Sequence, residues 1–130
     1  MKKKYWIRII IAVIVLAIII LILRSPEDFW IKGKNGEYVE HGAPASTLDY
    51  VKSQQDVVSC ARQLYQNEKA KGMVFISQCL GTCGDYAIDI VNVPKTREDD
   101  LKENQCEDYM QGKVTGFIEL DREGNIFRIS

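Results

Sequence analysis

Residues 7–23 read IRIIIAVIVLAIIILIL, and this run decides how the chain is organised. After Arg8 it holds fifteen consecutive apolar residues that end at Leu23, without Gly, Pro, Ser or charge. Counted from the interfacial aromatics Tyr5 and Trp6, the segment has nineteen residues, which is about 28 Å of helix at ~1.5 Å per residue. Because a bilayer core is roughly 30 Å thick and the run is apolar on every face, it predicts a transmembrane helix.

The charges on either side of the run set its orientation. The cations at its start are Lys2, Lys3, Lys4 and Arg8, and the cation directly after it is Arg24. Cytoplasmic flanks carry the excess of Lys and Arg, so we expect the N-terminus in the cytoplasm and the rest of the chain outside. The sequence thus predicts a single-pass protein of the cell membrane. Residues 1–24 form its basic tip and signal-anchor helix, and the bilayer is its partner along residues 7–23.

A cleaved signal peptide shares the basic start and the apolar core, so it is the main alternative to an anchor. Signal peptides usually have apolar cores of ~7–15 residues that are followed by a small-x-small pattern. The exit at residues 21–26 lacks that pattern, and no Cys near it would support a lipoprotein. These features favour the uncleaved anchor.

The chain beyond the run is long enough for one small domain and too short for two. The whole chain has 17 Lys and Arg and 18 Asp and Glu, but residues 1–23 hold four of the cations and none of the carboxylates. The outer part therefore has thirteen cations and eighteen carboxylates, a balance of −5. A nucleic-acid-binding domain would show a basic patch, so nucleic acid is not expected as a partner. We expect residues 25–45 to form a membrane-proximal linker and β-hairpin, and residues 46–130 to form an extracytoplasmic α+β domain.

The hairpin signal lies at residues 33–36, which read GKNG between two short apolar runs. Asn-Gly in this setting is typical of a tight hairpin turn. Trp30 and Tyr38 stand on either side of the turn and are our candidate interaction residues, for a partner or for lipid headgroups. The alternative is that these two aromatics pack on each other or on the main domain.

The remaining sequence predicts two helices and two pairs of strands. The expected elements are a helix from Ser46 or Thr47 to Lys71, a buried strand 73–78, a turn 79–84, a strand 85–93, a mostly polar helix 95–112, and a closing hairpin 114–120 with 125–129. The first helix depends on apolar residues at helical spacing and a basic last turn before Gly72. The order of the elements predicts an α+β fold, with a mainly antiparallel sheet and two packed helices.

Four cysteines, an even number, all lie beyond the apolar run: Cys60, Cys79, Cys83 and Cys106. In an oxidising compartment they predict two disulfides, although four cysteines allow three pairings. If the first helix and the following strand run antiparallel, Cys60 lies roughly 16 Å back along the helix and Cys79 roughly 20 Å along the strand. We therefore expect Cys60 to pair with Cys79 and Cys83 with Cys106, each bond stabilising the domain by ~2–4 kcal/mol.

Two other uses of the cysteines stay open. Four thiolates could form a zinc site, although Cys79 and Cys83 enclose three residues, where zinc knuckles usually enclose two. The same spacing weakens the second alternative, a membrane-tethered thiol–disulfide protein that uses these two cysteines.

The sequence shows no residue pattern typical of catalysis. His41, the single histidine, lies in a Gly/Pro loop, and Asp85 and Asp89 could flank a substrate but also suit ordinary strand positions. We therefore predict no enzyme, no metal and no cofactor. The sequence favours a binding or assembly module for a protein or cell-envelope partner.

Overall fold

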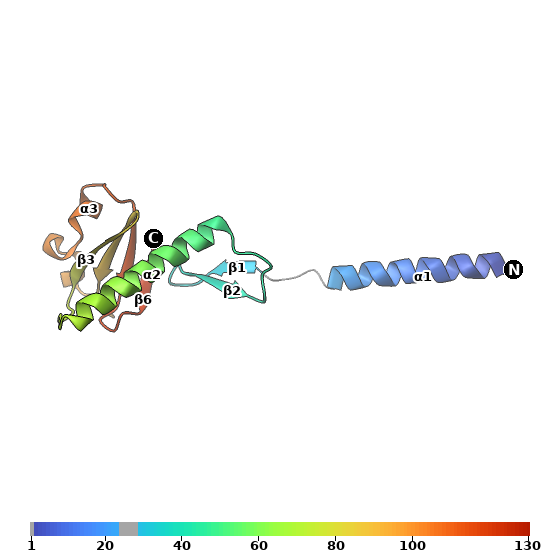
Figure 1. Ribbon diagram of the computed structural model, residues 1–130, viewed down its shortest axis with the longest axis horizontal. Coiled ribbons are helices and arrows are strands. Elements are labelled where there is room, and N and C mark those ends of the chain that lie inside the picture. The colour runs from blue at the N-terminus through green and yellow to red at the C-terminus, as the bar shows by residue number, and fades with distance from the viewer. Residues whose placement is uncertain (1, 24–28) are drawn as a thin grey trace.

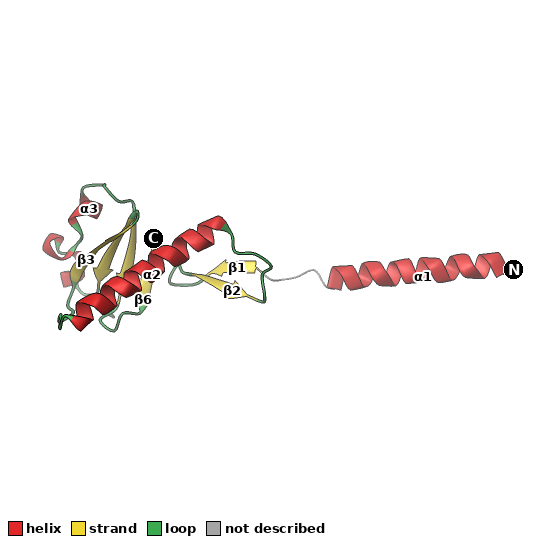
Figure 2. Ribbon diagram, viewed as in Figure 1, coloured by secondary structure: helices red, strands yellow, loops and turns green. Residues whose placement is uncertain are grey.

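The computed structural model describes residues 2–23 and 29–130. These residues form a long apolar helix, a two-stranded hairpin, a second long helix and a four-stranded sheet (Figures 1 and 2). The predicted α+β class is therefore confirmed. Arg24 and the exit at residues 25–28, on which the predicted orientation partly depends, lie outside the described residues.

The N-terminal helix α1 (Lys2–Leu23) is apolar on all sides between its basic start and its end. The window Lys3–Leu21 is long and apolar enough to cross a membrane, and none of it is buried against the rest of the described chain. A signal sequence would meet the same criteria, so the helix by itself shows a candidate membrane segment.

The predicted hairpin is confirmed: β1 (Phe29–Lys32) pairs antiparallel with β2 (Tyr38–His41). At its turn, Gly36 has a φ of +85°. A Cβ on Gly36 would lie 2.4 Å from the backbone oxygen of Ile129. The turn also accepts a hydrogen bond, because the amide of Ile129 donates to the carbonyl of Asn35 at 2.7 Å. Glycine therefore lets the hairpin turn sit against the last strand of the sheet.

The second helix, α2 (Asp49–Ala70), is the expected amphipathic helix. Its buried residues recur at helical spacing: Val51, Gln54, Val58, Ala61 and Tyr65. The residue at its N-cap is Leu48, whose side chain makes no capping hydrogen bond, so the predicted start of the helix at Ser46 or Thr47 is wrong. Figure 1 shows α2 running from the hairpin region along the four-stranded sheet.

The sheet has the strand order β3-β4-β5-β6. Its strands are β3 (Gln78–Cys83), β4 (Tyr86–Ile90), β5 (Gly116–Leu120) and β6 (Ile126–Ile129). The outer pairs β3–β4 and β5–β6 are antiparallel, as expected, and the central pair β4–β5 is parallel. The closing hairpin predicted from the sequence is β5–β6.

Strand β3 begins later than the sequence predicted. The apolar run 73–78 was expected to be a buried strand, but Val74 is 79% exposed. Phe75 alone of its large side chains reaches the core, where its ring stacks on Tyr65 with centroids 4.4 Å apart. The segment 79–84, expected as a turn, is instead mostly strand, because it pairs with β4 through a bulge between Cys79 and Gly81.

The segment 91–115, which we call the crossover, connects the parallel strands β4 and β5. It contains the short 3₁₀ helices η1 (Arg97–Asp100) and η2 (Lys102–Asn104) and one turn of α-helix, α3 (Glu107–Met110). The predicted helix 95–112 is therefore wrong. The segment has too few apolar residues to bury a continuous helical face, and isolated helices are marginal without such packing.

The two faces of the sheet are covered by different parts of the chain. Ile88 and Ile118 belong to the cluster that packs against α2, whereas their strand neighbours Ala87 and Phe117 belong to a smaller cluster with Cys106 of the crossover. Successive strand residues point to opposite faces. The sheet therefore lies between α2 on one face and the crossover on the other, which Figure 2 also shows.

Candidate functional site

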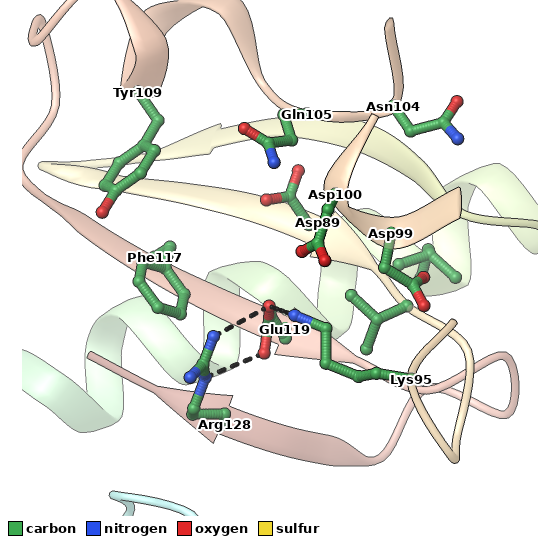
Figure 3. A pocket seen from close by; sticks show the side chains of 12 residues that line it. Asp89, Lys95, Asp99, Asp100, Asn104, Gln105, Tyr109, Phe117, Glu119 and Arg128 are labelled. Atoms are coloured by element: carbon green, nitrogen blue, oxygen red, sulfur yellow. Dashed lines mark hydrogen bonds and ion pairs between the residues drawn. The ribbon is translucent and has the colours of Figure 1, made fainter. Parts of the chain in front are cut away.

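A row of side chains crosses the sheet with one residue from each strand. Cys79 of β3 stands opposite Asp89 of β4, Asp89 opposite Glu119 of β5, and Glu119 opposite Arg128 of β6. Residues directly opposite in neighbouring strands share a face of the sheet, and this is the face beneath the crossover. The last three line a pocket between the sheet and the crossover (Figure 3).

Glu119 is fully paired with cations. Lys95 Nζ lies 2.8 Å from Glu119 Oε1, and Arg128 donates from Nε to Oε2 at 2.9 Å and from Nη2 to Oε1 at 3.2 Å. The guanidinium of Arg128 also lies over the ring of Phe117, 4.8 Å from its centroid. The Glu119 side chain is only 8% exposed, so these ion pairs compensate a carboxylate that would be costly to bury alone.

Asp89, the neighbour of Glu119, has no such partners. Its Oδ1 is buried and accepts no hydrogen bond from the described residues. Burial, and then repulsion from Glu119, raise the pKa of Asp89 from 3.8 to about 6, although the backbone amide of Cys106 and the charge of Lys95 act in the opposite direction. The lining of the pocket therefore includes a buried acceptor oxygen that lacks a hydrogen bond.

Asp99 fixes the beginning of the crossover. Its Oδ1 accepts from the backbone amide of Asn92 at 2.8 Å and its Oδ2 from the amide of Thr96 at 2.6 Å. Burial acts to raise the pKa of Asp99, but these amides, with the side chains of Ser77 and Asn92, lower it overall. This carboxylate is structural, and it holds the wall of the pocket in place.

The pocket is small, with a volume of about 120 Å³. A water molecule occupies ~30 Å³ of liquid, and drug-sized ligands need roughly 300–1,000 Å³, so the pocket has room for one small polar group. Tyr109 and Phe117 line one side, in edge-to-face contact with centroids 5.4 Å apart. The charged residues of the lining are Asp89, Asp99, Asp100, Glu119, Lys95 and Arg128. Carboxylates outnumber cations among them, which favours a cationic ligand.

A disulfide attaches the crossover to the sheet beside this pocket. Cys79 is bonded to Cys106, and both sulfurs lie within 4.8 Å of a carboxylate oxygen of Asp89. The second disulfide joins Cys60 of α2 to Cys83 at the end of β3. The predicted pairs, Cys60 with Cys79 and Cys83 with Cys106, are therefore wrong.

The physical reason for the exchanged pairing is the alternation of side chains along β3. Cys83 belongs to the cluster on the α2 face of the sheet, where Cys60 lies. Cys79 stands in the row on the opposite face, where the crossover brings Cys106. The prediction compared only distances along the helix and the strand, and these place Cys60 and Cys79 at one level. It did not include the bulge in β3 or the face of the sheet to which each cysteine points.

The two disulfides also bear on the alternative uses of the cysteines. All four lie in the described part of the chain, and none of them is a free thiol. Cys79 and Cys83 belong to different bonds, so they do not form a redox pair with each other. With all four sulfurs in disulfides, no thiolate remains for the alternative Cys₄ zinc site.

The candidate interaction residues of the hairpin face the domain. Trp30 donates from Nε1 to the backbone oxygen of Ser46 at 3.3 Å, and the ring of Tyr38 meets that of Tyr50 with centroids 5.1 Å apart. The opposite face of the hairpin is the outward one. It carries Phe29, Ile31 and Val39, which are 49%, 37% and 42% exposed. This face was not identified from the sequence, although the alternation of β1 contained the signal.

The sequence singled out Asp89, with Asp85, only as an acid that could flank a substrate. Asp85 accepts hydrogen bonds from Thr115 instead and lies apart from the pocket lining. Glu119 and Arg128 were missed, because the hairpin β5–β6 that carries them is joined to β4 by a parallel pairing of β5 that no local pattern indicated. Comparison with family models, with curated proteins and with solved structures gives no match.

Proposed function

We propose that this protein is a single-pass membrane protein that presents its disulfide-stabilised domain outside the cytoplasm and binds a cationic group of a partner in the sheet pocket. Support for the anchor comes from α1, which is long, apolar and unburied. Support for the outer location comes from the two disulfides, since such bonds persist in oxidising compartments. The excess of cations before the apolar run favours a cytoplasmic N-terminus.

The observation that carries the binding site is the unpaired oxygen of Asp89. A buried acceptor without a hydrogen bond costs roughly 1–3 kcal/mol, and the neighbouring carboxylates do not share this cost, because Glu119 and Asp99 have their own donors. A ligand with an N–H donor would recover the missing hydrogen bond. A positively charged donor would also relieve the repulsion between Asp89 and Glu119.

The size and lining of the pocket restrict the ligand to the end of a side chain. The volume of about 120 Å³ fits one ammonium or guanidinium group. The rings of Tyr109 and Phe117 offer an apolar surface on which the methylene stem of Lys or Arg can lie. The net charge of −5 on the outer part of the chain would also attract a basic partner. The proposed ligand is therefore a Lys or Arg side chain of a protein or cell-envelope peptide.

Binding of short peptides to the full chain in detergent micelles tests this proposal. The probes are the N-acetylated and C-amidated tripeptides Gly-Lys-Gly and Gly-Arg-Gly, with Gly-norleucine-Gly, capped in the same way, as the uncharged match for lysine. We expect the two basic tripeptides to shift the NMR signals of Tyr109 and Phe117, and the norleucine peptide to leave them unchanged.

A pair of charge-matched variants controls for general attraction to an acidic protein. Asp89→Asn removes the unpaired carboxylate, whereas Asp100→Asn removes an exposed carboxylate from the rim of the same pocket. Loss of the shifts in Asp89→Asn and their retention in Asp100→Asn would support the site. Equal loss in both variants, or no shift with any peptide, would refute it.

A further inference from the structure

The hairpin β1–β2 has two chemically different faces. Trp30 and Tyr38 lie on the face toward α2, and Glu40, opposite Trp30, belongs to this face as well. The other face is formed by Phe29 and Ile31 with their partners His41 and Val39. It carries no carboxylate, and its three apolar side chains are exposed to between 37% and 49%.

The position of this face in the chain limits what can cover it. The helix α1 ends at Leu23 and β1 begins at Phe29. The six intervening Cα–Cα steps span at most roughly 22 Å, and the headgroup layer on one side of a bilayer is itself about 5–7 Å thick. If α1 spans the membrane, as the proposed function requires, the first residue of the hairpin is held close to the outer headgroups. Figure 1 shows that the hairpin forms one end of the folded domain.

A second copy of the chain is a poor candidate for the same face. Stable protein interfaces bury about 800 Å² on each partner. Three side chains that are each less than half exposed fall well short of that area. A bilayer interface has no such minimum, because each apolar side chain that enters it contributes separately.

We infer that the face formed by Phe29, Ile31 and Val39 lies in the headgroup region of the outer leaflet and seats the domain on the membrane. Apolar and aromatic side chains next to a membrane span are suited to this interface. His41 stands at the rim of the face, and Lys34 lies in the turn between the two strands, where cations can meet phosphate groups. The inference depends on the membrane-anchored state and is independent of ligand binding in the pocket.

Fluorescence quenching by brominated lipids tests this seating, because the chain contains only two tryptophans, Trp6 and Trp30. The full chain is placed in vesicles of phosphatidylcholine and phosphatidylglycerol whose acyl chains are brominated at a shallow position. With Trp6→Phe and Trp30→Phe in place, Phe29→Trp puts a single reporter on the outward face. Glu40→Trp in the same background is the matched control, because it puts the reporter in the same hairpin but on the face toward α2.

We expect the shallow bromines to quench the reporter at position 29 and to leave the reporter at position 40 largely unquenched. Ile31→Ser with Val39→Ser, added to the Phe29→Trp reporter, should abolish seating, observed as loss of lipid quenching and higher acrylamide quenching at position 29. Far-UV circular dichroism would show whether the variants keep the native secondary structure.

The remaining outcomes separate this inference from the proposed anchor. The single variant Trp30→Phe leaves Trp6 as the reporter of α1. Quenching of Trp6 by lipid without quenching at position 29 would refute the seating and leave the anchor intact. Absence of both would refute the anchor as well. Protection of position 29 from acrylamide without quenching by lipid would refute the seating in favour of a protein contact.

Discussion

Asp89 and Glu119 stand opposite each other on the parallel strands β4 and β5, yet both nearby cations, Lys95 and Arg128, pair with Glu119 alone. The two carboxyl groups therefore have opposite roles. Glu119 is a compensated anion that holds β6 and the start of the crossover to the centre of the sheet. Asp89 is left with a buried, unpaired oxygen and a pKa of about 6. One carboxylate is neutralised by its ion pairs, and the other is the group that the proposed ligand would meet.

The raised pKa of Asp89 predicts how stability depends on pH. A carboxyl group whose pKa rises from 3.8 to about 6 on folding binds its proton more tightly in the folded state. The free energy of unfolding should therefore fall as the pH rises from about 4 to about 6, by up to about 3 kcal/mol. Asp89→Asn should remove this loss and be more stable than the parent at pH 7. Urea unfolding at several pH values measures the effect, and a parent-like pH profile in Asp89→Asn would contradict it.

The same ionisation predicts the pH dependence of ligand binding. A cationic group gains most from Asp89 in its charged form, which predominates above pH 6. Binding of Gly-Lys-Gly should therefore strengthen as the pH rises through about 6 and then level off. Asp89→Asn should show no such step. An affinity that stays constant between pH 5 and pH 7 would show that Asp89 does not contact the ammonium group.

Gln54 attaches the hairpin to α2 through a buried side chain. Its Oε1 accepts from the amide of Tyr38 at 2.7 Å, and its Nε2 donates to the carbonyl of Gly36 at 3.0 Å. Gln54→Ala leaves both backbone groups without these partners, so it should cost roughly 1–3 kcal/mol. The neighbouring Gln55 is exposed, and Gln55→Ala is the control with the same truncation on the solvent side. Hydrogen exchange should accelerate at Tyr38 in the first variant only.

Alanine substitutions at Gly36 and Gly72 distinguish the stability lost through a close contact from the stability lost through backbone strain. Both have positive φ, +85° and +80°. A Cβ at Gly36 would lie 2.4 Å from the oxygen of Ile129, whereas a Cβ at Gly72 would meet nothing within 4 Å. Gly72→Ala should cost about 1 kcal/mol from strain alone. Gly36→Ala should cost clearly more and loosen the hairpin from β6. Equal thermal shifts in the two variants would contradict the close contact.

Local signals in the sequence predicted the elements that depend on few residues. The Asn-Gly turn indicated the hairpin, apolar spacing indicated α2, and the adjacent segments 114–120 and 125–129 indicated β5–β6. Each of these patterns acts between residues close in the chain. They therefore fix the element and its approximate ends without knowledge of the rest of the fold.

The parts that were missed depend on contacts between distant residues. The parallel pairing of β4 and β5 joins strands separated by the whole crossover. Side chains alternate between the two faces in parallel and antiparallel strands alike, so alternation does not reveal the direction of the partner strand. The strand β3 contains Gln78 and Gly81, which have little β-propensity, and it forms because β4 supplies its hydrogen bonds. The pocket residues Glu119 and Arg128 become neighbours of Asp89 only through these pairings.

The disulfide pairing tests the arrangement of the sheet between α2 and the crossover most directly, because a different pairing would require a different fold. Alkylation of the native protein should add no groups before reduction and four after it, since none of the cysteines is a free thiol. Peptide mapping without reduction should recover Cys60 joined to Cys83 and Cys79 joined to Cys106. Peptides that join Cys60 to Cys79 would contradict the assigned faces of β3.

Removing each bond should have a similar effect on stability and a different effect on the pocket. The sequence separations are 23 and 27 residues, for which restriction of the unfolded chain is worth about 3.5 kcal/mol in either case. Only the bond between Cys79 and Cys106 fastens the crossover beside Asp89. Cys79→Ala with Cys106→Ala should therefore weaken binding of Gly-Lys-Gly and speed hydrogen exchange in α3, whereas Cys60→Ala with Cys83→Ala should lower the melting temperature without either effect. Equal losses of binding in the two double variants would mean that the crossover does not hold the pocket in shape.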